Sequence, residues 1–219
     1  MTDYTVIIAD ITASRKMQVY ERHEWQLYLK NAIVQINDNF RDIIDAPFMI
    51  TKGDEFQGVL KNLADVHQVM MKFEQLIFPL RLRYGVGYGK IHKMGSNIPI
   101  EMDGPAFHKA NAALQMAKKK KSSVFVETGF ETYDIAVNTI YQLIYAIKRR
   151  WSDVNYTRYW KYKELGTYER VAAEEGVSAQ AVWDSLHNSN AIDVLQAENS
   201  LHFILRYYDP EKFPVTCDE

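Results

Sequence analysis

The order of strand-like and helix-like segments along residues 5–127 limits this chain to few folds. Short β-rich apolar runs alternate with longer stretches whose apolar side chains recur every three or four residues, the pattern of one helix face. The expected segments are a strand at 5–9, a helix at 21–40, strands at 48–51 and 56–60, a helix at 63–77, a strand at 81–90, a helix at 105–119 and a strand at 124–127. The first six follow the ferredoxin-like split β-α-β order (βαββαβ). The sequence therefore predicts an α+β sandwich whose first strand is central and lies beside the third.

Glycines mark two special places in this pattern. In Lys52-Gly53-Asp54-Glu55, Gly53 takes the first central position of a two-residue hairpin turn, which suits type II′. Gly85, Gly87 and Gly89 alternate along the fourth predicted strand, so one face of that strand carries no side chains. We expect another group to approach that backbone closely.

The C-terminal third reads as helical. The expected segments are a long helix at 134–151, a linker at 152–156, helices at 159–165, 168–175 and 179–189, and a final helix with Leu201, Ile204, Leu205 and Tyr208 on one face. We divide the chain into an α+β domain at 1–132, a connecting helix and linker at 133–156, and a small all-α domain at 157–219.

Charge and composition limit the classes of protein to which this chain can belong. Residues 1–150 carry 20 basic and 16 acidic side chains, whereas residues 151–219 carry 6 and 12, so the C-terminal part is a poor electrostatic partner for nucleic acid. The single cysteine, Cys217, excludes a disulfide framework within one chain. No apolar stretch is long enough to cross a bilayer, and the N-terminus does not have the pattern of a secretory signal. We expect a cytoplasmic protein without a membrane partner.

Two carboxylates lie at positions where a metal ion could bind. Asp10 closes the first strand, and Asp54 sits at the tip of the hairpin that contains the third. If those strands are neighbours, both side chains reach one edge of the sheet. Mg²⁺ prefers oxygen ligands and usually binds through one or two carboxylates plus substrate phosphates. Alternatively, an Asp after a strand is a turn or cap residue, and Gly-Asp at a hairpin tip is turn chemistry alone.

Several motifs resemble those of the SatD family, whose first domain looks like a relative of the class III nucleotidyl cyclase and GGDEF diguanylate cyclase palm. The motifs are Asp10-Ile11-Thr12-Ala13-Ser14-Arg15, Gly53-Asp54-Glu55-Phe56-Gln57, Arg83-Tyr84-Gly85-Val86-Gly87-Tyr88-Gly89, Asp103-Gly104-Pro105-Ala106-Phe107 and Ala110-Asn111-Ala112-Ala113-Leu114-Gln115-Met116-Ala117-Lys118. The resemblance to the SatD family covers most of the chain, and the resemblance to the cyclases covers only about residues 5–127.

The resemblance implies a cyclase-type palm with a metal site. Asp10 and Asp54 match the two metal-binding aspartates, and the carbonyl of Ile11 matches a backbone ligand. The implied cofactor is Mg²⁺ or Mn²⁺. Cyclase-like palms often work as dimers, so a homodimer is implied as well.

The same resemblance implies a phosphate site beside the metal. Thr12, Ser14 and Arg15 would wrap the phosphates of a nucleoside triphosphate or dinucleotide, helped by backbone N–H groups at a helix start. Lys118 would contact phosphate. The alternatives are a surface salt bridge for Arg15 and, for the lysine run that begins at Lys118, a solvated helix end favoured by the helix dipole.

Two departures from the cyclase pattern weaken the case for catalysis. Cyclases that close a ring on one nucleotide use an Asn and an Arg four residues apart, where this chain has His108 and Ala112. Lys52 replaces the first glycine of the diguanylate cyclase signature. The motifs of this chain therefore support nucleotide and metal binding more strongly than they support cyclase activity.

Residues 168–188 fit a helix-turn-helix motif. Ala172, Gly176 and Val182 have the spacing of the packed alanine, the turn glycine and the buried aliphatic residue of that motif, and Ser178 can cap its second helix. The stretch that begins at Tyr168 looks like sigma-factor and resolvase motifs. The alternative is a small helical domain used for self-association or protein contact.

The predicted second helix gives an ambiguous indication of DNA binding. It offers Gln180, Trp183 and Asn188 outward but no Lys or Arg, although Arg to guanine is the commonest specific base contact. Arg170 and other nearby basic side chains could hold a DNA backbone while Gln180 and Asn188 read adenine.

Three hypotheses remain open from the sequence. The first is a nucleotide- and Mg²⁺-binding regulator, with a cyclase-like palm that need not be catalytic and a helix-turn-helix output domain. The second is a nucleotidyl cyclase or nucleotidyltransferase that acts as a dimer. The third is a DNA-binding transcriptional regulator whose palm is purely structural.

Overall fold

The structure, a computed structural model, describes residues 3–12, 19–93, 95 and 97–207. Its centre is a five-stranded sheet in the order β2-β3-β1-β4-β7, in which β4 and β7 are parallel and the other neighbours antiparallel. The strands are β1 (Tyr4–Ile11), β2 (Ile44–Lys52), β3 (Glu55–Leu60), β4 (Leu82–Gly89) and β7 (Val124–Glu127). The first strand is therefore central, between β3 and β4.

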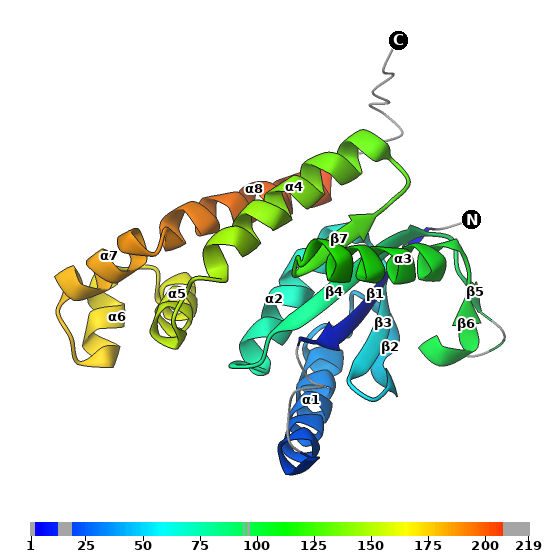
Figure 1. Ribbon diagram of the computed structural model, residues 1–219, viewed down its shortest axis with the longest axis horizontal. Coiled ribbons are helices and arrows are strands. Elements are labelled where there is room, and N and C mark those ends of the chain that lie inside the picture. The colour runs from blue at the N-terminus through cyan, green and yellow to red at the C-terminus, as the bar shows by residue number, and fades with distance from the viewer. Residues whose placement is uncertain (1–2, 13–18, 94, 96, 208–219) are drawn as a thin grey trace, which may run out of the picture.

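Helices cover both faces of the sheet (Figure 1). Ile7, Ala9 and Ile11 of β1 belong to a cluster with α1 (Val19–Asn39) and α2 (Val66–Leu76), the latter preceded by the short helix η2 (Leu63–Asp65). Val6 and Ile8 point to the opposite face, where they join a cluster with α3 (Pro105–Lys120). This alternation along one strand is the period of two that a buried strand requires.

The backbone of α3 lies directly on β4, as the alternating glycines suggested. A Cβ atom at Gly85 would lie 2.2 Å from the carbonyl oxygen of Ala110, and one at Gly87 would lie 2.1 Å from that of Ala106. The group that approaches the bare strand face is thus a helix. The connection between β4 and α3 contains β5 (His92–Lys93), η3 (Pro99–Glu101) and β6 (Met102–Asp103).

Up to residue 207, where the described part of the chain ends, five helices follow the sheet, and two of them lie side by side (Figure 1). Their bounds are α4 (Glu131–Lys148), α5 (Asp153–Leu165), α6 (Tyr168–Glu175), α7 (Ala179–Asn188) and α8 (Ala191–Tyr207). The pair is α4 and α8. Residues 153–156, expected in a linker, form the first turn of α5, because the Ser152 hydroxyl accepts a hydrogen bond from the N–H of Asn155 and caps that helix.

One hydrophobic cluster runs without interruption from the sheet into these C-terminal helices. Asn138 of α4 ties the helix to the edge strand: its amide nitrogen donates to the carbonyl oxygen of Val126 at 2.8 Å, and its amide oxygen accepts from the Val126 N–H at 2.7 Å. Within the described part of the chain, no helix combines the length and the apolar character that a membrane crossing would need.

Candidate functional site

Asp10 lies at the end of β1 between two basic side chains. The antiparallel register places it opposite Arg83 of β4, so both side chains project to the α3 face of the sheet. The Nη1 atom of Arg83 is 3.5 Å from Oδ1 of Asp10, and Nζ of Lys118 on α3 is 2.8 Å from Oδ2. The Asp10 side chain is 13% exposed. The structure thus brings together Asp10 and Lys118, 108 residues apart in sequence.

Asp54 lies at the same edge of the sheet, in the β2–β3 turn. Lys52 pairs with Glu55, which leaves Gly53 and Asp54 as a two-residue turn. Gly53 has φ 66°, as the type II′ turn requires at its first central position. Ala9 pairs with Phe56 at the last position of the β1–β3 ladder, so Asp10 follows this pair by one residue and the half-exposed Asp54 precedes it by two.

Counting only partners in the described part of the chain, two buried atoms in this site have no hydrogen bond. They are Oδ1 of Asp10 and Nε of Arg83. Oδ1 of Asp10 nevertheless lies 3.5 Å from Nη1 of Arg83. Buried polar atoms usually have a hydrogen-bond partner, so these two atoms could accommodate a further polar group. A carboxylate oxygen suits a divalent cation, and a guanidinium fork suits a phosphate.

The fit to Mg²⁺ depends on what accompanies the ion. Among the residues that the structure describes, no three His, Cys, Asp or Glu side chains form a group that could hold a metal. Mg²⁺ is commonly bound through one or two carboxylates plus substrate phosphates, so a cation at Asp10 would need phosphate oxygens to complete its coordination.

The other expected phosphate ligands are only partly described. Ile11 is buried and paired with Leu82 of β4. The N–H of Thr12 donates to the carbonyl oxygen of Arg81 at 2.7 Å, which continues the ladder past the end of β1. Ser14 and Arg15 lie outside the described residues.

The residues considered for DNA contact lie on α6 and α7. Trp183 and Asn188 are exposed, and the Trp183 ring stacks on His187 at 3.9 Å between centroids. Gln180 donates to Asp184 at 2.9 Å, and Arg170 donates to the carbonyl oxygen of Leu165 at 3.3 Å.

Basic side chains near α6 face acidic partners. Arg158 donates to Glu175 at 2.7 Å, and Lys161 pairs with Glu174 at 3.0 Å. These two positive charges are therefore largely neutralised within the protein.

Sequence reasoning missed a buried polar network between the sheet layer and the C-terminal helices. Glu198 of α8 is 2% exposed. Its Oε2 accepts from the Tyr159 hydroxyl at 2.6 Å and from Lys163 Nζ at 2.7 Å, and its Oε1 is 3.6 Å from Lys148 Nζ. His67 of α2 lies 3.7 Å away through Nε2. Only the spacing along each helix could have indicated that these positions face inward.

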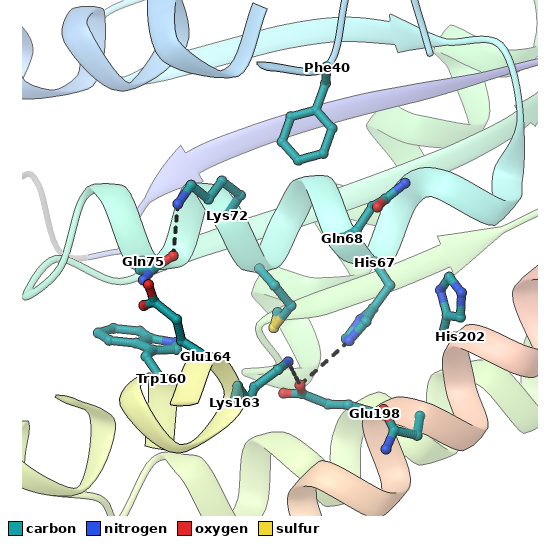
Figure 2. A pocket seen from close by; sticks show the side chains of 12 residues that line it. Phe40, His67, Gln68, Lys72, Gln75, Trp160, Lys163, Glu164, Glu198 and His202 are labelled. Carbon is teal, nitrogen blue, oxygen red and sulfur yellow. Dashed lines mark hydrogen bonds and ion pairs between the residues drawn. The ribbon is translucent and has the colours of Figure 1, made fainter. Parts of the chain in front are cut away.

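The network forms the floor of a groove of about 510 Å³ between α2 and the pair α5 and α8. Figure 2 shows His67 pointing down from α2 toward Glu198, with Lys163 beside it. Lys72 on the α2 wall donates to Gln75 at 3.1 Å. Two of the charged side chains of the groove, Lys163 and Glu198, thus engage each other, and Lys72 is engaged by an uncharged side chain.

Electrostatics inside the network favour its ionised form. Burial alone would raise the pKa of Glu198, but His67, Lys148 and Lys163 together hold it well below its usual range. Burial alone would lower the pKa of Lys148, yet Glu74 and Glu198 hold it above its ordinary value. Burial, reinforced by Glu198, raises the pKa of Tyr159, so its hydroxyl remains a donor.

Comparisons with known proteins identify one family and several solved structures. The model of the SatD family matches residues 4–197. A bacterial light-regulated adenylyl cyclase is 16% identical over 57% of this chain and 75% of that chain, with a TM-score of 0.40. The catalytic core of a rhodopsin-guanylyl cyclase with converted specificity, in complex with ATPalphaS, is 16% identical over 52% and 72%, with a TM-score of 0.39. No curated protein matches the chain.

Proposed function

The chain belongs to the SatD family, and we propose that it is a regulator that binds the phosphate groups of a nucleotide together with Mg²⁺. The binding site is the sheet edge where β1 ends. The carrying observation is the cluster of Asp10, Arg83 and Lys118, in which a carboxylate oxygen and a guanidinium nitrogen are buried without a hydrogen bond to any residue that the structure describes.

The acidic side chains of this site bind the cation, and the basic side chains bind the phosphate groups. Asp10 and Asp54 hold the divalent cation, and Mn²⁺ is an alternative ion. The bound cation neutralises phosphate charge. Lys118 and the planar fork of Arg83 hold phosphate oxygens, for which both residue types are suited. Some of their contacts with Asp10 would be exchanged for contacts with the ligand.

The segment after β1 completes this site in our proposal. The carbonyl of Ile11 is a further metal ligand, and Thr12, Ser14 and Arg15 wrap the phosphates. The strand order supports it, because β1 lies between β3 and β4, as in a ferredoxin-like palm of the cyclase type.

We propose regulation rather than cyclase activity. Where a cyclase would present an asparagine and an arginine, this chain has His108, whose Nε2 lies 3.4 Å from the carboxylate of the exposed Asp103, and Ala112, which offers no charge to a transition state. The palm at 1–132, the connecting segment at 133–156 and the helices at 157–219 then act as sensor, link and output, and the protein works as a homodimer. The output helices include the helix-turn-helix candidate at α6 and α7.

A thermal-shift experiment tests the phosphate site. A ligand at 100 times its dissociation constant adds about 2.7 kcal/mol of stability, which raises Tm by roughly 5–10 °C for a chain of this size. ATP or GTP with Mg²⁺ should produce such a rise in the unaltered protein, and Asp10→Asn or Lys118→Ala should abolish it.

Lys119→Ala is the matched control, because Lys119 is the exposed neighbour of Lys118 in the same lysine run. It should keep the full rise. Absence of any rise with millimolar nucleotide, or an undiminished rise in Asp10→Asn, contradicts the proposal. Since Asp10→Asn changes the basal Tm as well, the quantity compared is the difference with and without ligand.

A further inference from the structure

Large apolar side chains on α4 and α8 are open to solvent. Ile135 and Leu143 of α4 are 60% and 62% exposed, and Phe203 and Tyr207 of α8 are 63% and 62% exposed. The rings of Phe203 and Tyr207 contact each other, with 4.7 Å between their centroids. Single exposed apolar residues are common, but a contiguous group of them usually marks a binding surface.

The exposed sides of the two helices adjoin. α4 and α8 lie side by side (Figure 1). Both bury their opposite side in the same hydrophobic cluster, α4 through Tyr141 and Ile144 and α8 through Leu201 and Leu205. Their exposed side chains therefore point away from that cluster on both helices. We call this outer surface the α4–α8 face and define it by Ile135, Thr139, Leu143, Ser200, Phe203 and Tyr207.

The α4–α8 face carries no charged side chain. Residues 135–147, which make up most of α4, contain no Asp, Glu, Lys or Arg. In α8, the only such residue between Asp193 and Arg206 is Glu198, which is buried. The solvent side of a helix is normally polar and charged, whereas the centres of protein interfaces are depleted of charge and enriched in aromatic residues. This composition is thus typical of an interface.

A second copy of this chain is the partner that such a face suits. In a two-fold dimer each copy contributes the same surface, so a face with a net charge would repel itself. The C-terminal part is acidic overall, with 6 basic and 12 acidic side chains in residues 151–219. The uncharged α4–α8 face avoids the repulsion that an acidic face would meet.

The face is large enough for a reversible dimer. α4 has 18 residues and α8 has 17, so each helix is about 26 Å long. Two such helices, each about 10 Å wide, present about 500 Å². A two-fold pair would therefore bury about 1,000 Å² in total, the lower limit for a specific interface.

We propose that two copies of this chain form a two-fold dimer through the α4–α8 face. The proposal rests on the homodimer of the proposed function and adds the surface that forms it.

Two hollows in the molecule are less suited to a partner. One is a cavity of about 200 Å³ at the sheet edge, on the α2 and α4 side, and the other is the groove of about 510 Å³ between α2 and the pair α5 and α8. Lys148 in the cavity pairs with Glu74, and Lys163 in the groove pairs with Glu198. These cations are therefore already engaged inside the protein.

Sedimentation equilibrium of the full chain tests the proposed dimer. An interface of this size is expected to have a Kd in the micromolar range, so the protein is measured from about 1 to about 200 µM. The unaltered chain should pass from monomer to dimer over this range.

Two variants place a carboxylate on the α4–α8 face, one on each helix. Burying an unpaired charge in the interface should weaken the dimer by about 100-fold or more, so Leu143→Glu and Phe203→Glu should remain monomers. Both positions are exposed in the single chain, so an unchanged circular dichroism spectrum should show that the variants are folded. Leu27→Glu is the matched control, because Leu27 is an exposed leucine on α1, and it should dimerise as the unaltered chain does.

The outcomes separate this proposal from the rest of the proposed function. A chain that stays monomeric at the highest concentration overturns the α4–α8 dimer together with the homodimer, while the phosphate site is judged by its own thermal shift. A dimer that persists in both Leu143→Glu and Phe203→Glu, or that Leu27→Glu dissociates to the same extent, leaves the homodimer standing and overturns the α4–α8 face as its interface.

Discussion

Replacing Glu198 by glutamine tests whether the buried network holds the C-terminal helices on the sheet layer. Glutamine keeps the size of the side chain and one acceptor for the Tyr159 hydroxyl, but it removes the charge that faces Lys148 and Lys163. The Lys148 side chain is only 5% exposed and would keep Glu74 as its sole carboxylate partner among the described residues. Lys163 is 33% exposed, so water compensates part of its loss.

The expected cost follows from these exposures. Breaking a fully buried ion pair costs about 3–5 kcal/mol. Because Lys148 retains Glu74 and Lys163 is partly solvated, we expect a loss of about 2–4 kcal/mol in the free energy of unfolding. In a chain of 219 residues, this lowers Tm by roughly 4–16 °C.

The effect should depend on pH in a defined direction. The pKa of Glu198 is lower in the folded protein than in the unfolded chain. Its ionised form therefore stabilises the fold above the unfolded pKa of about 4.3, and this contribution is lost as the pH falls below that value toward the folded pKa. The stability difference between the unaltered protein and Glu198→Gln should be complete at neutral pH and shrink below pH 4.

Urea denaturation followed by circular dichroism measures both quantities. Glu164→Gln is the control, since Glu164 is an exposed carboxylate on the wall of the same groove and its replacement should change stability by less than about 0.5 kcal/mol. A loss below 1 kcal/mol in Glu198→Gln, or a loss that grows toward acid pH, would refute the reasoning.

Three further predictions concern packing, hydrogen bonding and ionisation. Gly87→Ala should lower the free energy of unfolding by about 2–3 kcal/mol in urea denaturation, because the new methyl group would meet the backbone of α3 at 2.1 Å. Asn138→Ala should cost about 2–4 kcal/mol in the same assay, because it leaves the N–H and carbonyl of Val126 without their side-chain partners. Burial raises the pKa of Tyr156 to about 12. In ultraviolet titrations of tyrosine ionisation, the unaltered protein and Tyr156→Phe should therefore give the same absorbance change up to about pH 11 and differ by one tyrosine only above it.

The sheet and its glycines were predictable because their signals are local. The hairpin needs a positive φ at its first central residue, and Gly53 supplies it within four residues of sequence. The bare face of β4 follows from Gly85 and Gly87 alone, and the structure confirms that a close neighbour occupies it. Hydrophobic periodicity likewise placed α2 and α3 to within a few residues.

The arrangement of charges was not predictable because it depends on tertiary contacts. Lys118 could be named from its motif, but the role of Arg83 as the second partner of Asp10 follows only from the register of β1 with β4. Helical periodicity places Glu198 on the inward side of α8, but it does not predict that Tyr159 and Lys163 would meet it there. The prediction of a linker at 152–156 was wrong for a related reason. Tyr156 is buried in the core and holds the first turn of α5 in place.

The buried network also limits how a ligand could act on the C-terminal helices. Lys148 lines the cavity at the sheet edge, pairs with Glu74 of α2 and faces Glu198 of α8. A group that enters the cavity therefore meets the side chain that joins these helices. Because one hydrophobic cluster spans the sheet and the helices, a free hinge between them would expose apolar surface at a large cost in free energy.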